Sequence, residues 1–373
     1  MEKNSKLGKK LLATGNGRCN IMNAEEPVYF GEKEFAHQVL SYCPPDSVQA
    51  FLEGLGLVLR TEEGGRMYPA GNRGDMVLDA LTTPLFGSGV QVLLDTQAEK
   101  LEQRAEGWRV ETTDGRSFSA PSLILAGGSC AAPKLGGTDS MYQLLTPLGF
   151  ELARPLPALC ALETQRKPLQ GLSGLRLLAR LTLLAQGEPA DAAQGEMLFG
   201  ETGVSGVCAM QLARTAAQAL DKGQEVVLSV DVTPTLGLRD TAMERKPPEK
   251  PGQMAETARQ WLLKRSGFLP DNRLLQGALP KPLADRLQGL SIEETARNLA
   301  DWRLQVTGVR GFDHAQVAAG GISPRGVNPQ TMESALPGLY LCGELLDVDG
   351  DTGGHNLMFA LATGILAGES AAG

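Results

Sequence analysis

The chain has 373 residues, of which 42% are hydrophobic and 21% charged, enough for a large buried core and, at roughly 150 residues per domain, about two domains. Its formal net charge of -8 argues against a nucleic-acid or anionic-membrane partner, because either needs a basic surface. Three histidines argue against a multi-histidine metal site, and six scattered cysteines predict free thiols in a reducing cytoplasm. The 45 glycines predict backbone that turns tightly or approaches a ligand.

The first part of the chain alternates helical and strand patterns. Helices are expected over 6–13, over 32–55 with a break at Pro44 and Pro45 and a cap at Asp46 or Ser47, and over 75–83, ended by Pro84. Strands are expected at 57–60, 66–68, 90–94, 108–112, 117–119 and 122–126. The alternation predicts an α/β sheet with parallel segments.

A β-rich segment and a helical segment then interrupt this pattern. Residues 159–236 are expected to be β-rich, 239–251 to form a charged, solvated excursion, and 237–303 to be mainly helical. The α/β pattern resumes at Leu304 and ends with a strand at 339–342 and a helix at 357–367. The predicted layout is one α/β domain in two parts, 1–158 and 304–373, around an inserted domain at 159–303.

The segment from Gly343 to Leu357 is the most informative motif. An apolar strand stops at Gly343 and Glu344, where a carboxylate can accept hydrogen bonds from ribityl or ribose hydroxyls. Gly353 and Gly354 then open a helix, whose free N–H groups and positive dipole suit the pyrimidine end of a flavin. An ordinary strand–loop–helix corner is the alternative, but so many glycines and acids together favour a ligand site.

A second candidate is the loop that contains Gly15, Gly17, Arg18, Cys19 and Asn20. It fits only part of a dinucleotide fingerprint, because Asn20 takes the place of the third glycine and a helix precedes it where a strand is required. The loop is better interpreted as facing a ligand with a guanidinium and an amide than as a surface turn, since Cys19 is of a type that is usually buried.

The third motif is the strand that ends in Ala126, Gly127 and Gly128. Ser129 resembles a nucleophile elbow, but the final glycine is absent and no histidine or acid follows at a recognisable spacing, which argues against a hydrolase. The glycines between 200 and 206 are interpreted as turns. No single residue is assigned as the catalytic acid; Arg18 and His355 are the candidates.

Six separated motifs together resemble one family, in its order and spacing. They lie at 9–20, 65–69, 126–128, 320–322, 331–334 and 343–356. The family is the BaiN-like family of bacterial FAD-dependent oxidoreductases, some of whose members are called aminoacetone oxidase family proteins, and it is distantly related to fumarate-reductase flavoproteins. The resemblance implies a Rossmann-like FAD-binding domain with an inserted domain that combines a β-barrel-like sheet and helices.

The resemblance also implies a set of cofactor-binding residues. Glu2, with Lys3 beside it, would hold the adenosine ribose, Ala98 would contact adenine, and Glu344 and Asp347 would hold the ribityl and phosphate side. Arg18, Asn20 and the loop from Gly353 to Leu357 would surround the isoalloxazine. The whole implied set is Glu2, Lys3, Gly15, Gly17, Arg18, Cys19, Asn20, Ala98, Ala126, Gly127, Gly128, Gly343, Glu344, Asp347, Gly353, Gly354, Asn356 and Leu357.

The sequence departs from the family at several positions. His355 stands where the family usually has tyrosine, and Gly200 and Glu201 stand where it has threonine and histidine. The ribose-binding acid normally follows a Gly-x-Gly-x-x-Gly loop by about 20 residues, whereas this chain contains no such loop. The first strand, loop and helix of the βαβ unit are therefore expected to be missing before Glu2, and the chain as written is expected to bind FAD weakly or not at all.

The leading functional hypothesis is an oxidoreductase in which NAD(P)H reduces FAD and the flavin reduces a small organic substrate, with an activated C=C bond as the candidate target. One alternative is a non-catalytic, FAD-deficient remnant. Another is an oxidase that uses oxygen and acts on amines or amino-ketones.

Overall fold

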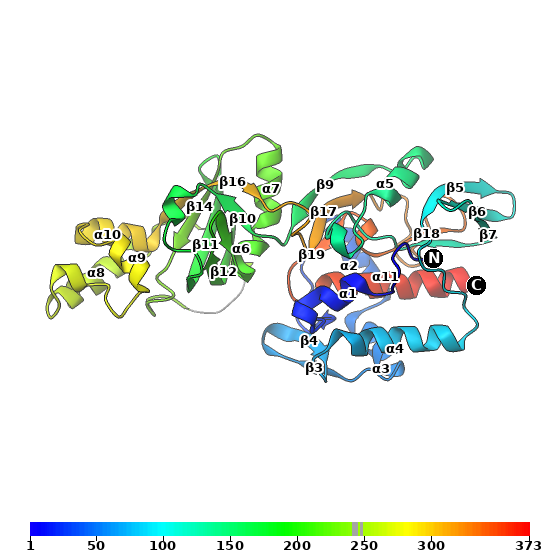
Figure 1. Cartoon of the computed structure of the whole chain (residues 1–373), viewed down its shortest axis with the longest axis horizontal. Helices are drawn as coiled ribbons and strands as arrows, with labels where there is room; N and C mark the ends of the chain where they lie inside the picture. Colours follow the sequence, from blue (N-terminus) through cyan, green and yellow to red (C-terminus); the bar gives the residue numbers. More distant parts are fainter. Residues whose placement is uncertain (241–244, 247–248) are drawn as a thin grey trace. The chain divides into compact units, whose positions relative to one another are not determined.

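The computed structural model describes residues 1–240, 245–246 and 249–373, which form two compact units (Figure 1). The first unit combines 1–155 with 317–373, and the second spans 156–316. The chain thus returns to the first unit at Val317 and not at Leu304 as expected from the sequence. The strand β16 (Trp302–Val309) accounts for the difference, because it pairs with strands of the second unit.

The first unit is built from small sheets and six α-helices. Its helices are α1 (Lys9–Ala13), α2 (Lys33–Tyr42), α3 (Pro45–Gly54), α4 (Gly74–Gly87), α5 (Ser140–Leu145) and α11 (His355–Ala372). Its strands are β1 (Met22–Asn23), β2 (Tyr29–Gly31), β3 (Leu59–Thr61), β4 (Arg66–Pro69), β5 (Ala98–Arg104), β6 (Gly107–Thr112), β7 (Ser117–Ala120), β8 (Leu123–Leu125), β17 (Val317–Ile322), β18 (Leu339–Leu341) and β19 (Val348–Gly350), with β9 (Leu152–Ala158) leading out of the unit.

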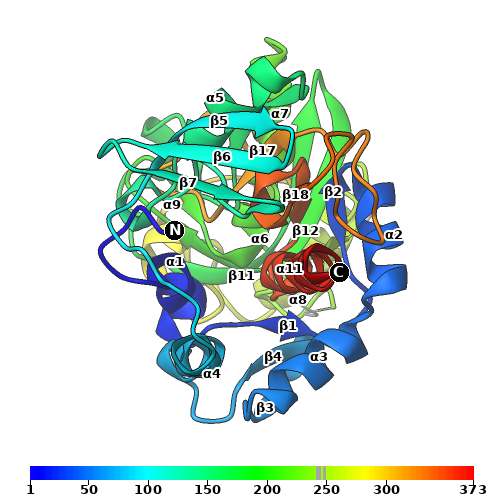
Figure 2. The ribbon, with the colours of Figure 1, turned by 90° about the vertical axis from the view of Figure 1, so that its right-hand side faces the viewer.

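The helix α11 forms the centre of the first unit. It is seen end-on in Figure 2, with β18 on one side and β1 on the other. Its side chains Met358, Phe359 and Ala362 are fully buried, and they belong to one hydrophobic core with residues of α2, α3, β8 and β18. The strands β8 and β18 pair in parallel, in agreement with the expected α/β sheet with parallel segments, so that both end on the same side. No helix among the described residues is both long and apolar enough to cross a membrane.

Three local expectations for the first unit are wrong. Pro84 lies inside the last turn of α4, where its missing N–H removes one intrahelical hydrogen bond without ending the helix. The helix α3 is preceded by Pro44 and begins with Pro45, so neither Asp46 nor Ser47 is its cap. Residues 90–94 form no strand; Leu93 instead accepts a hydrogen bond from the Glu2 N–H at 2.8 Å.

The second unit contains a closed β-barrel and a helical segment. Its strands are β10 (Leu162–Thr164), β11 (Arg176–Ala185), β12 (Glu188–Phe199), β13 (Gly203–Ser205), β14 (Val226–Asp231), β15 (Arg245–Lys246) and β16. The order β11-β14-β16-β10-β13-β12 closes because β12 also pairs with β11, and β15 adds to β12. The helices are α6 (Val207–Gln211), α7 (Ala213–Asp221), α8 (Ala255–Ser266), α9 (Lys281–Arg286) and α10 (Ile292–Ala300). The expected barrel and helical part are both present.

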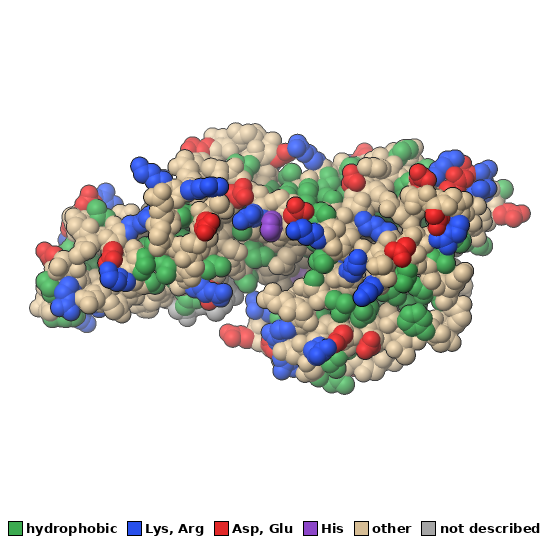
Figure 3. Space-filling view, in the orientation of Figure 1, with side chains coloured by type: hydrophobic (Ala, Val, Ile, Leu, Met, Phe, Trp, Pro, Cys, Tyr) green, Lys and Arg blue, Asp and Glu red, His purple; other side chains and the backbone are tan. Residues whose placement is uncertain are grey.

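Charged side chains of both signs are interspersed on the surface. On the face drawn in Figure 3, lysine and arginine alternate with aspartate and glutamate, and no broad basic field appears there. This agrees with the net charge of -8.

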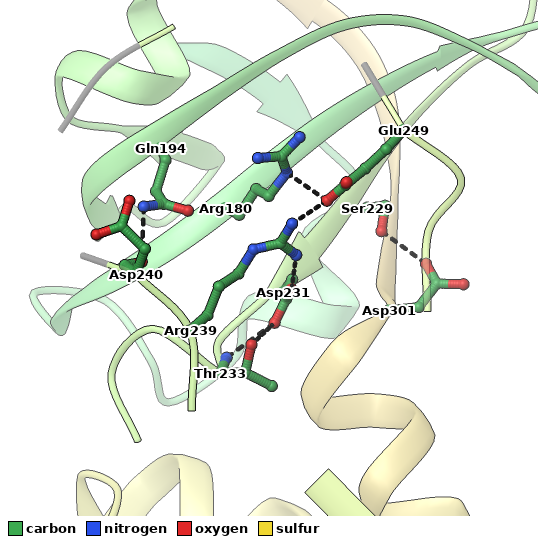
Figure 4. A network of polar contacts seen from close by, with 9 residues as sticks. All are labelled: Arg180, Gln194, Ser229, Asp231, Thr233, Arg239, Asp240, Glu249 and Asp301. Atoms are coloured by element: carbon green, nitrogen blue, oxygen red, sulfur yellow. Dashed lines mark hydrogen bonds and ion pairs between the residues drawn. The ribbon is translucent and has the colours of Figure 1, made fainter. Parts of the chain in front are cut away.

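One end of the barrel holds a buried network of charged side chains (Figure 4). Asp231, at the end of β14, accepts hydrogen bonds from the N–H and hydroxyl of Thr233 and from Arg239 at 3.0 Å. Arg239 also pairs with Glu249, which in turn lies 2.8 Å from Arg180 Nε. Burial raises the pKa of Asp231, while the bonds from Thr233 and Arg239 oppose the rise. Charges out of water must be paired in this way to be tolerated.

The expected solvated excursion at 239–251 falls partly outside the described residues, which omit 241–244 and 247–248. At its described ends the expectation is confirmed for Asp240 and Lys250, which are exposed, and wrong for Arg239 and Glu249. The side chains of Arg239 and Glu249 are only 18% and 27% exposed, because they tie both ends of the segment into the network.

We expect Arg239→Met to destabilise the barrel by about 3 kcal/mol, because it leaves the buried Asp231 carboxylate without its cation. Arg104→Met, which removes an exposed partner of Glu102, is the control and should cost less than about 1 kcal/mol. Urea unfolding measures both. The added substitution Asp231→Asn should restore stability to Arg239→Met, and no restoration would contradict the charge-pairing account.

Candidate functional site

The N-terminus of α11 is formed by two glycines that no other residue could replace without strain. Gly353 and Gly354 have φ values of 112° and 103°, in the left-handed region that side chains disfavour. A Cβ on Gly354 would overlap the carbonyl of Met22 and lie 2.9 Å from Asn20 Oδ1. The glycine pair therefore allows the loop that contains Asn20 and the strand β1 to lie directly against the start of α11.

Two polar atoms at this place are buried and unpaired. Asn20 Oδ1 and His355 Nδ1 have no hydrogen-bond partner among the described residues. A buried acceptor or donor without a partner costs free energy, so such atoms point to a bound ligand or an ordered water. Both predicted segments, the loop after α1 and the start of α11, are thus brought together and each contributes one unpaired atom.

His355 is a buried, neutral imidazole. Its side chain is 4% exposed, and the ring of Tyr29 packs edge-on against it with the ring centroids 6.2 Å apart. The Tyr29 hydroxyl donates to the His355 carbonyl oxygen at 3.0 Å. Burial lowers the pKa of His355, and the nearby Asp351 opposes the shift. The N-terminal position on a helix also disfavours a cation.

Arg18 does not face a ligand with a free guanidinium. Its Nη2 atom lies 2.5 Å from Glu62 Oε1, its Nε donates to Asn72 Oδ1, and the group stacks on the Tyr68 ring 4.1 Å from its centroid. Arg18 therefore fixes the loop against the β3–β4 hairpin. The loop turns at this place with positive φ at Gly15, Gly17 and the fully buried Cys19, and burial raises the pKa of that thiol.

Glu344 lies at the end of β18 and is held by three donors. Ser129 Oγ donates to Glu344 Oε1 at 2.7 Å, the Ala318 N–H donates to the same oxygen at 3.2 Å, and Lys10 Nζ lies 2.5 Å from Oε2. Gly343, at φ 67°, starts this turn, and its N–H donates to Thr363 of α11. Lys10 and Ser129 were not singled out from the sequence as partners of Glu344, because only the fold brings them together.

A cavity of about 420 Å³ lies beside Glu2 and the end of β8. Six of the expected cofactor-binding residues line it, namely Glu2, Lys3, Ala98, Ala126, Gly127 and Gly128. Lys10, the partner of Glu344, also lines the cavity. Glu2 Oε1 accepts hydrogen bonds from Asn4, and Gly128 has open space around its Cα. The cavity is therefore lined by carboxylate, lysine and bare backbone.

Three further expected residues lie in or near the loop before α11. The Asn356 side chain accepts from the Gly350 N–H and donates to the Gly350 carbonyl, both at 2.8 Å, which clamps the loop before α11. The backbone of Asp347 bonds to Ile322 and Glu32, so this residue holds β2 and β17 together. Leu357 is half-buried in the first turn of α11.

In the part of the chain that the structure describes, no group of three or more ligand-type side chains is placed to hold a metal ion.

The sequence model of the HI0933-like protein Rossmann domain matches residues 1–370. The chain belongs to this family. It is 34% identical over 391 aligned residues to the 3-dehydro-bile acid delta(4,6)-reductase of Clostridium scindens, an alignment that covers 100% of this chain and 92% of the relative. It is 24% identical to the ribosomal RNA dihydrouridine synthase of Haemophilus influenzae, with 95% of this chain and 87% of that protein covered.

Among solved structures, the 3-ketosteroid-delta4-(5alpha)-dehydrogenase of Rhodococcus jostii RHA1 aligns with a TM-score of 0.47 and 15% identity, over 100% of this chain and 91% of that one. Membership of the HI0933-like family confirms three expectations from the sequence: the family resemblance, the Rossmann-type α/β fold and an FAD-dependent oxidoreductase.

We expect Gly354→Ala to destabilise the first unit by about 2–3 kcal/mol, because the new Cβ meets the Met22 carbonyl at a positive φ. Gly364→Ala is the matched control. Gly364 lies inside α11 with open space around it, so alanine should stabilise the helix by about 0.5–1 kcal/mol. Thermal unfolding distinguishes the two, and equal effects would contradict the packing at the glycine pair.

The neutral His355 predicts a loss of stability on acidification. Below its ordinary pKa of 6.5 the unfolded chain binds a proton that the folded protein does not, so the free energy of unfolding falls until the pH reaches the lowered pKa. Chemical unfolding of the wild type between pH 8 and pH 5 should show this fall, and His355→Gln should show less of it. Identical pH dependence in the two proteins would contradict a buried neutral imidazole.

Proposed function

We propose that this chain binds FAD with its isoalloxazine at the N-terminus of α11, and passes hydride from NAD(P)H through the flavin to a small organic substrate. The observation that carries the proposal is the unpaired Asn20 Oδ1 beside the glycine pair Gly353 and Gly354. A ring with N–H and carbonyl groups on one edge can satisfy both the amide oxygen and the free N–H groups of the helix.

The residues present fit such a ring. The glycine pair carries no Cβ that would block the helix N-terminus, and the side chain of Asn20 ends within reach of it. Arg18 acts indirectly in this proposal, since its bonds to Glu62 and Asn72 set the position of the loop that presents Asn20. A positive helix end also favours the negative charge that a flavin acquires on reduction.

The other half of the cofactor fits the cavity beside β8. Glu2 is placed to accept hydrogen bonds from ribose hydroxyls, and the bare backbone of Gly127 and Gly128 permits close approach. Lys3, Lys9 and Lys10 line the same cavity and can face phosphate. Glu344 would exchange part of its present bonding, to Ser129 and Lys10, for ribityl hydroxyls.

FAD supplies hydride acceptance and donation; the chain's own residues position it and exclude water. His355 is the remaining candidate for proton transfer, because it is the titratable side chain with an unpaired atom at the helix start. Its lowered pKa keeps it neutral near pH 7. We assign no substrate contact to it.

For the substrate we propose an activated C=C bond in a small molecule. The bile acid reductase from Clostridium scindens, by its name, acts on a 3-dehydro-bile acid, and it aligns with the whole of this chain. The ribosomal RNA dihydrouridine synthases share the family, so RNA is the second candidate. The net charge of -8 favours the small molecule, since RNA binding requires cationic side chains.

The flavin site is tested by titration. Because the sequence predicts weak binding without a Gly-x-Gly-x-x-Gly loop, the affinity is measured with added FAD and not judged from the colour of the purified protein. Asn20→Ala should weaken binding about tenfold, the value of one hydrogen bond to a buried group. Asn298→Ala, which removes an amide bonded to the Glu294 carbonyl on α10, should leave the affinity unchanged.

Loss of affinity with both variants, or with neither, would contradict the role of Asn20. Absence of saturable binding up to millimolar FAD would contradict the proposal that this chain binds the cofactor.

The reaction is tested under anaerobic conditions with FAD at saturation. Adding NADH or NADPH should bleach the flavin, and a 3-keto-4-ene steroid acid should restore the oxidised spectrum with formation of the saturated product. Oxygen consumption with an amine or amino-ketone, in the absence of nicotinamide, would instead support the oxidase alternative. Conversion of uridine in ribosomal RNA would overturn the choice of a small molecule.

A further inference from the structure

His355 lies at the start of α11, where the charge of the flavin proposed above would act on its imidazole. It occupies the first position of α11, next to the glycine pair, and its Nδ1 atom is buried without a partner among the described residues. The imidazole is nine-tenths or more buried under Tyr29. An unpaired nitrogen at such a position can give or take one proton without any rearrangement of existing bonds.

The charged groups around His355 are few. Asp351 precedes it in the loop, Asp349 lies on β19, Tyr29 on β2, and Arg66 on β4 approaches the neighbouring Gly353. On α11 itself the only acid is Glu369, near the other end of the helix. Asp349 and Asp351 are both buried, at 2% and 5% exposure, and Asp351 is the acid whose charge acts on the imidazole.

We propose that His355 takes up one proton when the flavin is reduced and releases it when the flavin is reoxidised; this proposal rests on the proposed function. Two electrons and one proton convert the oxidised flavin into its singly negative reduced form, and the second proton goes from solvent to the imidazole. The added negative charge at the start of α11 supplies the driving force.

The balance of charges supports this exchange. With the flavin oxidised, burial and the helix N-terminus keep the imidazole neutral. A negative charge within about 5 Å favours the protonated form strongly enough to move the pKa of a buried group by about one to three pH units. Together with Asp351, that charge offsets the cost of a buried imidazolium.

The exchange has a measurable signature in the flavin's midpoint potential. For a two-electron couple each coupled proton changes the potential by about 30 mV per pH unit. Above neutrality, where free reduced flavin carries one negative charge, and below the raised pKa of His355 in the reduced complex, the potential of the FAD-saturated wild type should therefore fall by about 60 mV per pH unit. His355→Gln, with no titrating group, should fall by about 30 mV per pH unit.

His37→Gln is the matched control, because His37 is exposed on α2 and should retain the wild-type slope. If the wild type and His355→Gln have the same slope, the proposal is overturned while the flavin site stands. If no variant and no wild-type protein holds flavin at saturating FAD, the proposed function itself is overturned.

A second measurement needs only the wild type. The FAD complex is reduced with dithionite in weakly buffered solution at pH 7.5, and the protons that dithionite itself releases are subtracted. The complex should then take up about two protons per flavin. Uptake of one proton would contradict the role of His355 even if His355→Gln fails to fold.

Discussion

The close packing of Gly353 and Gly354 against the Asn20 loop and β1 is the contact on which the site depends. A side chain at Gly354 would meet the Met22 carbonyl, so the start of α11 could not approach β1 with any other residue there. The approach is fixed from both sides. Asn23 donates to the Gly353 carbonyl at 2.9 Å, and Tyr29 donates to that of His355. A helix N-terminus, an amide oxygen and a buried imidazole are thereby held together before any ligand is bound.

The two units differ in whether their buried polar groups are paired. In the barrel, Arg180 and Arg239 are paired with Glu249 and Asp231, so the network is satisfied within the unit. At the start of α11, by contrast, Asn20 and His355 each keep a buried atom that has no partner in the part of the chain that the structure describes. Unsatisfied polar atoms cost stability and are retained where a ligand will satisfy them, whereas satisfied networks serve the fold. This contrast is the physical reason to place the function in the first unit.

The sequence predicted the larger features well, because each has a local signal. Alternating strands and helices indicated the α/β unit, and glycine with acid after an apolar strand indicated the region of Glu344 and Gly353. Features that depend on distant contacts could not be read this way. Arg18 was expected to face a ligand, but Glu62 and Asn72, far along the chain, engage its guanidinium. Likewise, β16 was expected in the α/β domain because of its place in the sequence. It pairs instead with the barrel strands β10 and β14, which lie far from it along the chain.

The central claim is that the isoalloxazine lies at the start of α11. A crystal structure of the chain soaked with FAD tests it most directly. The account predicts the pyrimidine edge of the ring within hydrogen-bond distance of Asn20 and of the first N–H groups of α11, with the ribose beside Glu2. A flavin ring bound elsewhere, with Asn20 and His355 still unpaired, would contradict it.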